Sequence, residues 1–321
     1  MTWGAYYQGN GEVRRVDFDP PPPWREFPRK PLAGKFNPPQ GLAVAVNAAL
    51  SLRRPLLLTG APGSGKSTVI ESVAEELDLG PVLRWNITSK SMLNDGLYSY
   101  DALGRIHDQQ LRAASARMSG AKHAMTDDIA PFLRLGPLGT ALVPSGRPRA
   151  LLIDEIDKSD LDLPSDLLNV LERGEYEIPE LIRYQENAAA VKVRTWDDEG
   201  KYRVEQGKVT CTAFPFIVMT SNEERDFPPA FLRRCIRFTM PPPSEGELRE
   251  IVHSLLEIDV PETGPIAELV RGFAARLNNR ARSVAVDQLL NAIFVLTGES
   301  MPDATQRSEL VDILLRELSV A

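Results

Sequence analysis

One glycine-rich loop constrains the fold of this 321-residue chain more than any other feature. Residues 60–67 fit the pattern G-x-x-x-x-G-K-S. The apolar run 56–59 before the loop predicts a buried parallel strand, and residues 67–77 after it predict a helix. Glycines let the backbone curl so that its amides point at phosphate oxygens, at the positive end of the following helix. The pattern in this context therefore predicts a nucleotide phosphate site.

Side chains in this loop supply the charge and the metal contact that a nucleoside triphosphate requires. Lys66 is expected to reach the β- and γ-phosphates, and Ser67 is expected to ligate Mg²⁺ through its hydroxyl. The sequence thus predicts ATP and Mg²⁺ as ligands. The candidate nucleotide-binding residues of this region are Gly60, Ala61, Pro62, Gly63, Ser64, Gly65, Lys66, Ser67 and Thr68.

An apolar strand that ends in two acids is the second candidate element. Residues 151–153 are apolar, and Asp154 and Glu155 follow them. Asp154 is expected beside Mg²⁺, and Glu155 is expected to face the γ-phosphate and take a proton from the attacking water. We interpret the nearby Asp157 and Asp160 as helix-capping or surface acids.

One asparagine and four arginines complete the candidate site. Asn222 follows the apolar run 215–221 and is a candidate to hold the attacking water or sense the γ-phosphate, with a backbone-satisfying turn asparagine as the alternative. Arg233 and Arg234 are expected on a short helix, as a finger that reaches a neighbouring subunit's ATP, with surface ion pairs as the alternative. Arg280 and Arg282 are candidates to fold over the nucleotide of their own chain.

Between residues 40 and 242 apolar strands alternate with helical segments. This alternation predicts an α/β fold in which helices cover both faces of a parallel sheet. Two segments, at about 119–149 and 189–210, break the pattern and are interpreted as insertions projecting from the sheet. The second alternates polar and apolar residues, as a β-hairpin does. The expected strands lie at 56–59, 81–88, 150–153, 215–221 and 236–240.

The flanking regions have different patterns. Residues 1–39 are rich in proline, which cannot donate a helical hydrogen bond, and are expected to form an extended arm. From residue 245 onward the periodicity is helical and predicts a small all-α lid domain of about four helices over residues 243–321. The predicted domains are therefore 1–39, 40–242 and 243–321.

Composition narrows the classes of partner and compartment. The net charge is -7, which disfavours nucleic acid as a partner because phosphate neutralisation needs clustered Lys and Arg. Cys211 and Cys235 are interpreted as reduced thiols, with a single disulfide as the alternative. The three histidines lack metal-ligand spacing, and no run reaches the roughly 18 apolar residues of a membrane span. We therefore expect a cytoplasmic protein.

Together these motifs resemble an AAA+ ATPase of the MoxR-like group over about residues 40 to 300. Residues 60–67 are similar to Walker A, 151–155 to Walker B, Asn222 to sensor 1, Arg233 and Arg234 to the arginine finger, and Arg280 and Arg282 to sensor 2. Residues 136–138 are similar to that group's GPL element and 167–172 to its LLexxE helix, while 119–149 and 189–210 stand where it has a helix-2 insert and a pre-sensor-1 hairpin. Two departures are an Asp at 157 in place of the group's Asn, and the absence of the small-Pro-Arg sensor-2 motif.

The resemblance implies a homo-oligomeric ring, usually a hexamer, with each ATP between subunits and a remodelled protein client. Residues 99–105 and the proline-rich arm look like a subgroup found alongside von Willebrand A-type proteins, which makes such a protein a candidate client. The alternatives are a slow ATP-binding switch or scaffold, and a P-loop kinase or nucleic-acid translocase. GTP in place of ATP is a minor option, since no Asn-Lys-x-Asp motif is present.

Overall fold

The computed structural model describes residues 6–7, 9–28, 36–119, 128–184, 188–197, 200–277, 284–297, 309–311 and 313–315. The chain forms two compact units. The first comprises Gln40–Thr59 and Ser67–Phe238, and the second comprises Met1–Pro39, Gly60–Lys66 and Thr239–Ala321. The division into domains at residues 39 and 242 stays a prediction.

A five-stranded sheet forms the centre of the first unit. Its strand order is β11-β1-β10-β5-β2, and the ladders between β1 and β10, β10 and β5, and β5 and β2 are parallel. Adjacent strands are distant in sequence because parallel pairing requires crossover connections, which helices supply here. The predicted parallel α/β sheet is confirmed. The strands are β1 (Leu56–Thr59), β2 (Leu83–Asn86), β5 (Ala150–Asp154), β10 (Phe216–Ser221) and β11 (Ile236–Thr239).

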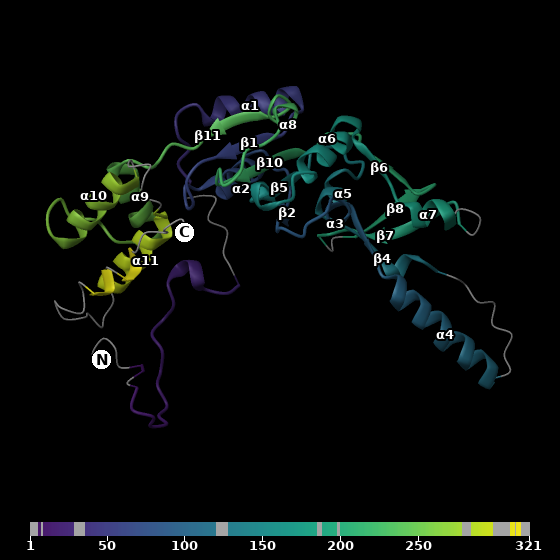
Figure 1. Ribbon diagram of the computed structural model, residues 1–321, viewed down its shortest axis with the longest axis horizontal. Helices are drawn as coiled ribbons and strands as arrows, with labels where there is room; N and C mark the ends of the chain where they lie inside the picture. Colours follow the sequence, from purple (N-terminus) through teal and green to yellow (C-terminus); the bar gives the residue numbers. More distant parts are fainter. Residues whose placement is uncertain are drawn as a thin grey trace. The chain divides into compact units, whose positions relative to one another are not determined.

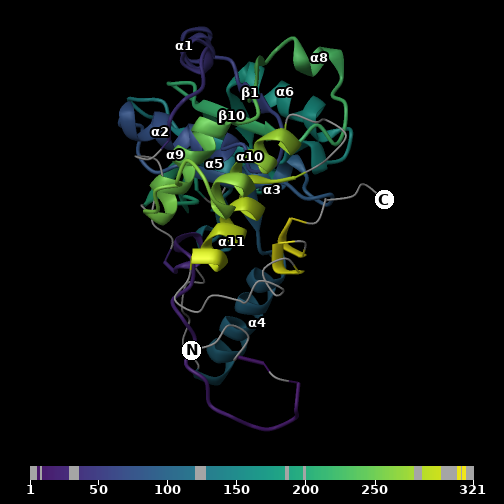
Figure 2. The same cartoon turned by 90° about the vertical axis from the view of Figure 1, so that its left-hand side faces the viewer.

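Helices cover this sheet, with α1 on one side and α2 on the other in both ribbon views (Figures 1 and 2). All six residues of β10 are buried, as expected for a central strand covered on two faces. The helices of this part are α1 (Leu42–Leu52), α2 (Lys66–Glu76), α3 (Leu93–Leu97), α4 (Ala102–Ser119), α5 (Pro137–Ala141), α6 (Leu163–Arg173), α7 (Pro179–Tyr184) and α8 (Pro229–Leu232), with short 3-10 helices η3 (Ala130–Phe132) and η4 (Ile156–Lys158).

A second sheet of six strands lies in the same unit, in the order β3-β4-β7-β8-β9-β6. The expected hairpin at 189–210 is its antiparallel pair β7 and β8, whose register runs from Ala190 opposite Glu205 to Arg194 opposite Lys201. Residues 198–199 of the hairpin lie outside the described residues. The strands are β3 (Tyr98–Tyr100), β4 (Leu133–Leu135), β6 (Glu175–Glu177), β7 (Ala190–Arg194), β8 (Lys201–Glu205) and β9 (Lys208–Thr210).

The expectation that residues 119–149 project from the sheet is wrong for residues 129–143. Leu135, Leu138 and Leu142 of this stretch are fully buried in the main hydrophobic core. Glycine makes this packing possible, because a Cβ on Gly139 would lie 1.9 Å from the carbonyl oxygen of Leu97. Helix α5 thus packs its backbone directly against the end of α3. Residues 120–127 lie outside the described residues.

The second unit is built on α9 (Glu245–Leu256), α10 (Pro265–Leu277) and α11 (Val286–Thr297), with further helical residues at 309–311 and 313–314. The predicted C-terminal helices are therefore present. Helix α9 begins with a capping box in which Ser244 and Glu247 satisfy each other's backbone amides. From the N-terminal arm, η1 (Pro23–Arg25) brings Trp24 onto α11, where its indole nitrogen donates to Asn291 and its ring meets Phe294 edge to face.

The length and hydropathy of these helices decide whether any of them could cross a membrane. Within the part of the chain that the structure describes, none is both long enough and apolar enough to cross a bilayer.

Candidate functional site

The phosphate loop has the backbone conformation that its glycines were expected to allow. Gly60, Gly63 and Gly65 have φ values of 138°, 75° and 80°. A Cβ on Gly60 would lie 2.9 Å from the carbonyl oxygen of Met240, and one on Gly63 would lie 2.9 Å from the amide nitrogen of Val286. Both φ and space therefore require glycine at these two positions.

Lys66 closes the loop on itself. Its ammonium group donates to the carbonyl oxygens of Gly60 at 2.7 Å and Ala61 at 2.8 Å, and only 7% of the residue is exposed. A buried ammonium needs such acceptors because desolvation of an unpaired charge is costly. The Ser64 amide also donates to Ala61, and Pro62 completes the turn, while Thr68 lies in the first turn of α2.

Three oxygens meet where β5 and β10 end. The Ser67 hydroxyl donates to Asp154 Oδ1 at 2.9 Å, and the Thr220 hydroxyl donates to the same oxygen at 2.5 Å. Carboxylate and hydroxyl oxygens are the hard ligands that suit Mg²⁺, which keeps water and phosphate oxygens in its remaining positions. This donor set fits Mg²⁺, and the described residues hold no group of three or more His, Cys, Asp or Glu that would suit another metal.

Thr220 was absent from the sequence-based site, although a signal for it existed. It is the one polar residue among the five that open β10, and only 1% of it is exposed. Since β10 and β5 are parallel neighbours, their carboxyl ends share one edge of the sheet. The hydroxyl there contacts both acids of the motif, because the Glu155 amide donates to it at 2.9 Å.

The backbone of Glu155 has a conformation that residues other than glycine rarely adopt. Its φ is 59° and its ψ is 48°, the left-handed region. Such a conformation costs about 1–2 kcal/mol in a non-glycine residue and persists only where neighbours enforce it. The carboxylate accepts a hydrogen bond from Lys158 Nζ at 2.7 Å, and this bond raises the pKa of the Lys158 ammonium.

Asp157 is neither a helix cap nor a surface acid, so this expectation was wrong. Only 3% of the residue is exposed, and its Oδ2 accepts the amides of Asn222 at 2.9 Å and Glu224 at 3.2 Å. The reason is topological, because η4 follows β5 at the sheet edge where the loop after β10 also begins. Asp160, by contrast, is exposed as expected.

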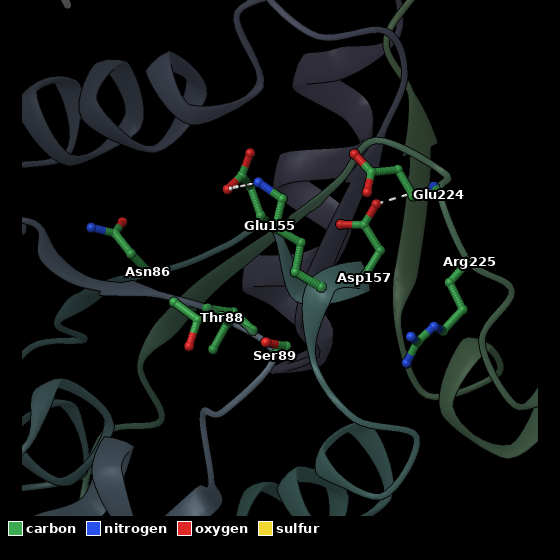
Figure 3. A pocket seen from close by; sticks show the side chains of 9 residues that line it. Asn86, Thr88, Ser89, Glu155, Asp157, Glu224 and Arg225 are labelled. Carbon is green, nitrogen blue, oxygen red and sulfur yellow. Dashed lines mark hydrogen bonds and ion pairs between the residues drawn. The ribbon is translucent and has the colours of Figure 1, made fainter. Parts of the chain in front are cut away.

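A pocket of about 660 Å³, lined mostly by polar and charged residues, opens beside these acids (Figure 3). The end of β2 forms one wall, and Asn86 there is in register with Asp154 on β5. Residues 86–89 were not predicted for the site, although β2 also ends at the edge where nucleotides bind in open parallel sheets. The lining residues are Asn86, Ile87, Thr88, Ser89, Glu155, Asp157, Lys158, Glu224 and Arg225.

The paired arginines lie at the end of α8 rather than along it. Arg233 is the exposed C-cap residue, and no side-chain partner of Arg233 occurs among the described residues. Arg234 forms an ion pair with Glu172 of α6 and donates to the carbonyl oxygen of Ala230 at 3.2 Å. Arg280 and Arg282 lie outside the described residues.

Comparison with known proteins gives one family. The family described as AAA domain (dynein-related subfamily) matches residues 55–235. No curated protein matches the chain.

Solved structures with some likeness include a mutant RuvB from Thermotoga maritima, with 15% identity over 85% of this chain and 67% of that one, and a TM-score of 0.43. PCH-2 from C. elegans has 15% identity, covers 88% and 65%, and has a TM-score of 0.36. NtrX from Brucella abortus in complex with ADP has 15% identity, covers 87% and 55%, and has a TM-score of 0.42. The chain thus spans less than two thirds of the length of the last two proteins.

Proposed function

The chain belongs to the dynein-related subfamily of AAA domains, and on that premise we propose that it hydrolyses ATP with Mg²⁺. One observation carries the proposal. Hydrogen bonds join Ser67, directly after the phosphate loop, to Asp154 and through it to Thr220. Ser67 and the ends of two neighbouring strands thus meet at one carboxylate oxygen, and a serine and an aspartate of this kind are the pair that holds Mg²⁺ in P-loop NTPases.

Each residue of the proposed site has a distinct task. Lys66 would exchange its two carbonyl acceptors for β- and γ-phosphate oxygens, and Ser67 and Asp154 would hold Mg²⁺. Mg²⁺, when bound, neutralises the charge on the phosphate oxygens. Glu155 accepts the proton of the attacking water once its carboxylate leaves Lys158, and Asn222 orients that water.

We further propose that hydrolysis is completed by an arginine from another subunit. Arg233 supports this idea because it is exposed, whereas Arg234 is already paired with Glu172. An arginine supplied in trans stabilises charge that develops on the transferred phosphoryl group. This role implies a ring of identical chains, for which a hexamer is the proposed size.

The proposed biological role is the remodelling of a protein client, as in MoxR-like AAA+ proteins. Residues 136–138 support this assignment, because the group's GPL element stands here as the buried start of α5. Helix α6 supports it as well, since it buries Leu167 and Leu168 and presents Glu172 to Arg234. A von Willebrand A-type protein is the proposed class of client.

The test uses two substitutions in the site and one matched control. Lys66→Ala is expected to abolish ATP binding, measured with a fluorescent ATP analogue. Glu155→Gln is expected to keep binding and lose phosphate release. Glu224→Gln, a change to an exposed glutamate lining the same pocket, should leave both unchanged. Phosphate release by Glu155→Gln at the wild-type rate would disprove the assignment of Glu155 as the base. If GTP bound more tightly than ATP, the proposed substrate would be GTP instead.

A nucleotide-gated switch is the second candidate, and the ion pair between Glu155 and Lys158 favours it. The ion pair holds the Glu155 carboxylate against Lys158, so the carboxylate has to leave the ammonium before it can reach a water molecule. A switch therefore predicts slow turnover in the wild type that rises about tenfold or more in Lys158→Met, which is about 1.4 kcal/mol in barrier height. Turnover that is unchanged or lower in Lys158→Met would favour the remodelling ATPase.

A further inference from the structure

The carboxyl group of Asp157 is buried beside the proposed active site and is only partly hydrogen-bonded within the described residues. The residue is 97% buried, as its exposed fraction of 3% shows, and it follows Glu155 by two positions at the end of β5. Its Oδ1 is buried and accepts no hydrogen bond from any residue in the described part of the chain. Burial of a polar group with an unsatisfied oxygen costs free energy, so the hydrogen bonds that this group does make call for an explanation.

Those remaining bonds organise the loop after β10. Oδ2 accepts the amides of Asn222 and Glu224, while the amide between them, on Glu223, donates to Ser221 Oγ at 3.0 Å. Glu223 has a φ of 62°, so the chain reverses there and aims two amides at one oxygen. Alternating backbone conformations of this kind form concave nests for anions, and here the anion is the protein's own carboxylate.

We propose that Asp157 is a positioning residue that fixes the loop carrying Asn222, and so sets the position of the proposed water-orienting side chain relative to Glu155. This inference rests on the proposed ATP hydrolysis. Figure 3 shows Asp157 between Glu155 and Glu224, with its bond to the loop drawn as a dashed line. The proposed base Glu155 is the N-cap of η4, and Asp157 within η4 holds the loop of the proposed sensor, so a single residue separates the two functions.

A second contact between the same two strand ends makes this coupling specific. Thr220 lies two residues before Asn222, and its hydroxyl accepts a hydrogen bond from the Glu155 amide. The β5 end therefore holds the β10 end at residue 220 and again at residues 222 and 224. Removal of the Asp157 contact should release the loop but leave the Thr220 contact, and with it Asp154 and the nucleotide, in place.

The experiment compares four single variants and one double variant with the wild type. Asp157→Ala removes the acceptor, Asp157→Asn keeps one acceptor oxygen of the same reach, Asn222→Ala removes the proposed sensor, and Asp160→Asn changes an exposed acid three residues away as the control. The double variant joins Asp157→Ala to Asn222→Ala. The measurements are kcat, ATP affinity and amide hydrogen exchange.

We expect Asp157→Ala to lower kcat by about tenfold or more with ATP affinity changed by less than about threefold, because only transition-state positioning is lost. Asp157→Asn should retain most activity, and Asp160→Asn all of it. The double variant should be no slower than Asn222→Ala, since both changes remove one function and are therefore non-additive. Exchange of the Asn222 and Glu224 amides should accelerate in Asp157→Ala, while amides of β10 stay protected.

Three results would overturn the inference. They are wild-type kcat in Asp157→Ala, independent multiplication of the two defects in the double variant, and unaltered exchange at Asn222 and Glu224. If Asp157→Ala fails to fold, a kcat of Asp157→Asn that drops together with ATP affinity also counts against positioning. Absence of ATP turnover in the wild type would overturn the proposed function together with this inference, whereas normal turnover in Asp157→Ala overturns the inference alone.

Discussion

Thr220→Val is the substitution that tests the oxygen cluster most directly. Valine has the shape of threonine and replaces only the hydroxyl, which is 1% exposed along with the rest of the residue. Two hydrogen bonds are lost, one donated to the Asp154 carboxylate and one accepted from the Glu155 amide. The other contacts of β10 with its neighbours should remain.

The size of the effect follows from these two bonds. A hydrogen bond to a charged group contributes about 1.5–3 kcal/mol, and an amide left unsatisfied costs about 1–3 kcal/mol. The gain from burying a methyl group offsets about 0.8 kcal/mol of this. We therefore expect the free energy of unfolding to fall by about 2–5 kcal/mol, which lowers the urea midpoint by roughly 0.7–1.7 M at a slope of about 3 kcal/mol/M.

Urea unfolding followed by circular dichroism measures this shift, and Thr210→Val is the matched control because Thr210 is exposed on β9. The control should move the midpoint by no more than about 0.2 M, since surface substitutions stay within about 0.5 kcal/mol. ATP turnover should also fall, because Glu155 loses the contact that anchors its left-handed backbone. A Thr220→Val protein as stable as the control would refute the view that this hydroxyl holds the two strand ends together.

Three further predictions address the loop, the arginines and the cysteines. Gly63→Ala and Gly80→Ala both place alanine at a φ near 76°, but only at Gly63 does a neighbour, Val286, lie within 3 Å of the new Cβ. Gly63→Ala alone should therefore weaken ATP binding. Equal ATP affinities in the two variants would contradict the role of close packing. Arg233→Ala should remove the dependence of ATP turnover on protein concentration, while Arg234→Ala should preserve it. Arg234→Ala should also change the free energy of unfolding by less than about 1 kcal/mol, because the ion pair of Arg234 with Glu172 is partly exposed. Loss of the concentration dependence in Arg234→Ala instead of Arg233→Ala would assign the finger to Arg234. Burial raises the pKa of the Cys235 thiol to about 12. The free energy of unfolding should therefore fall as the pH rises from 9 towards 12, because the thiol ionises in the unfolded chain and stays neutral in the folded one. Cys235→Ala should flatten this slope, and an unchanged slope would contradict a buried neutral thiol.

The sequence predicted the central sheet because its three inner strands β1, β5 and β10 are apolar runs that end in polar residues. It did not predict the six-stranded second sheet in full, since β3, β4, β6 and β9 have only three residues each and pair across long separations. Only the β7–β8 hairpin carries enough alternation to be visible without its partners. Short strands draw their stability from neighbours, and a local pattern contains no information about those.

The candidate site shows the same contrast. The phosphate loop and the pair Asp154 and Glu155 are contiguous motifs, so the sequence alone could single them out, and their roles stay a prediction. Thr220 and Asp157 were missed or misread because their importance arises from the pairing of β5 with β10, which brings together residues more than 60 positions apart. The sequence of a buried strand shows where that strand ends, but it does not show which other strand ends beside it in the sheet.

The close packing of the phosphate loop has a consequence for how small a nucleotide-binding fragment of this protein can be. The loop backbone touches Met240 and Val286, and the ring of Phe36 would lie 3.5 Å from a Cβ on Gly65. All three residues fall outside the family-matched segment 55–235. A fragment cut at the limits of that segment would carry every residue of the loop and yet none of these walls. We therefore expect the smallest fragment with the proposed nucleotide binding to extend on both sides of the family-matched segment, at least from Phe36 to the start of α11.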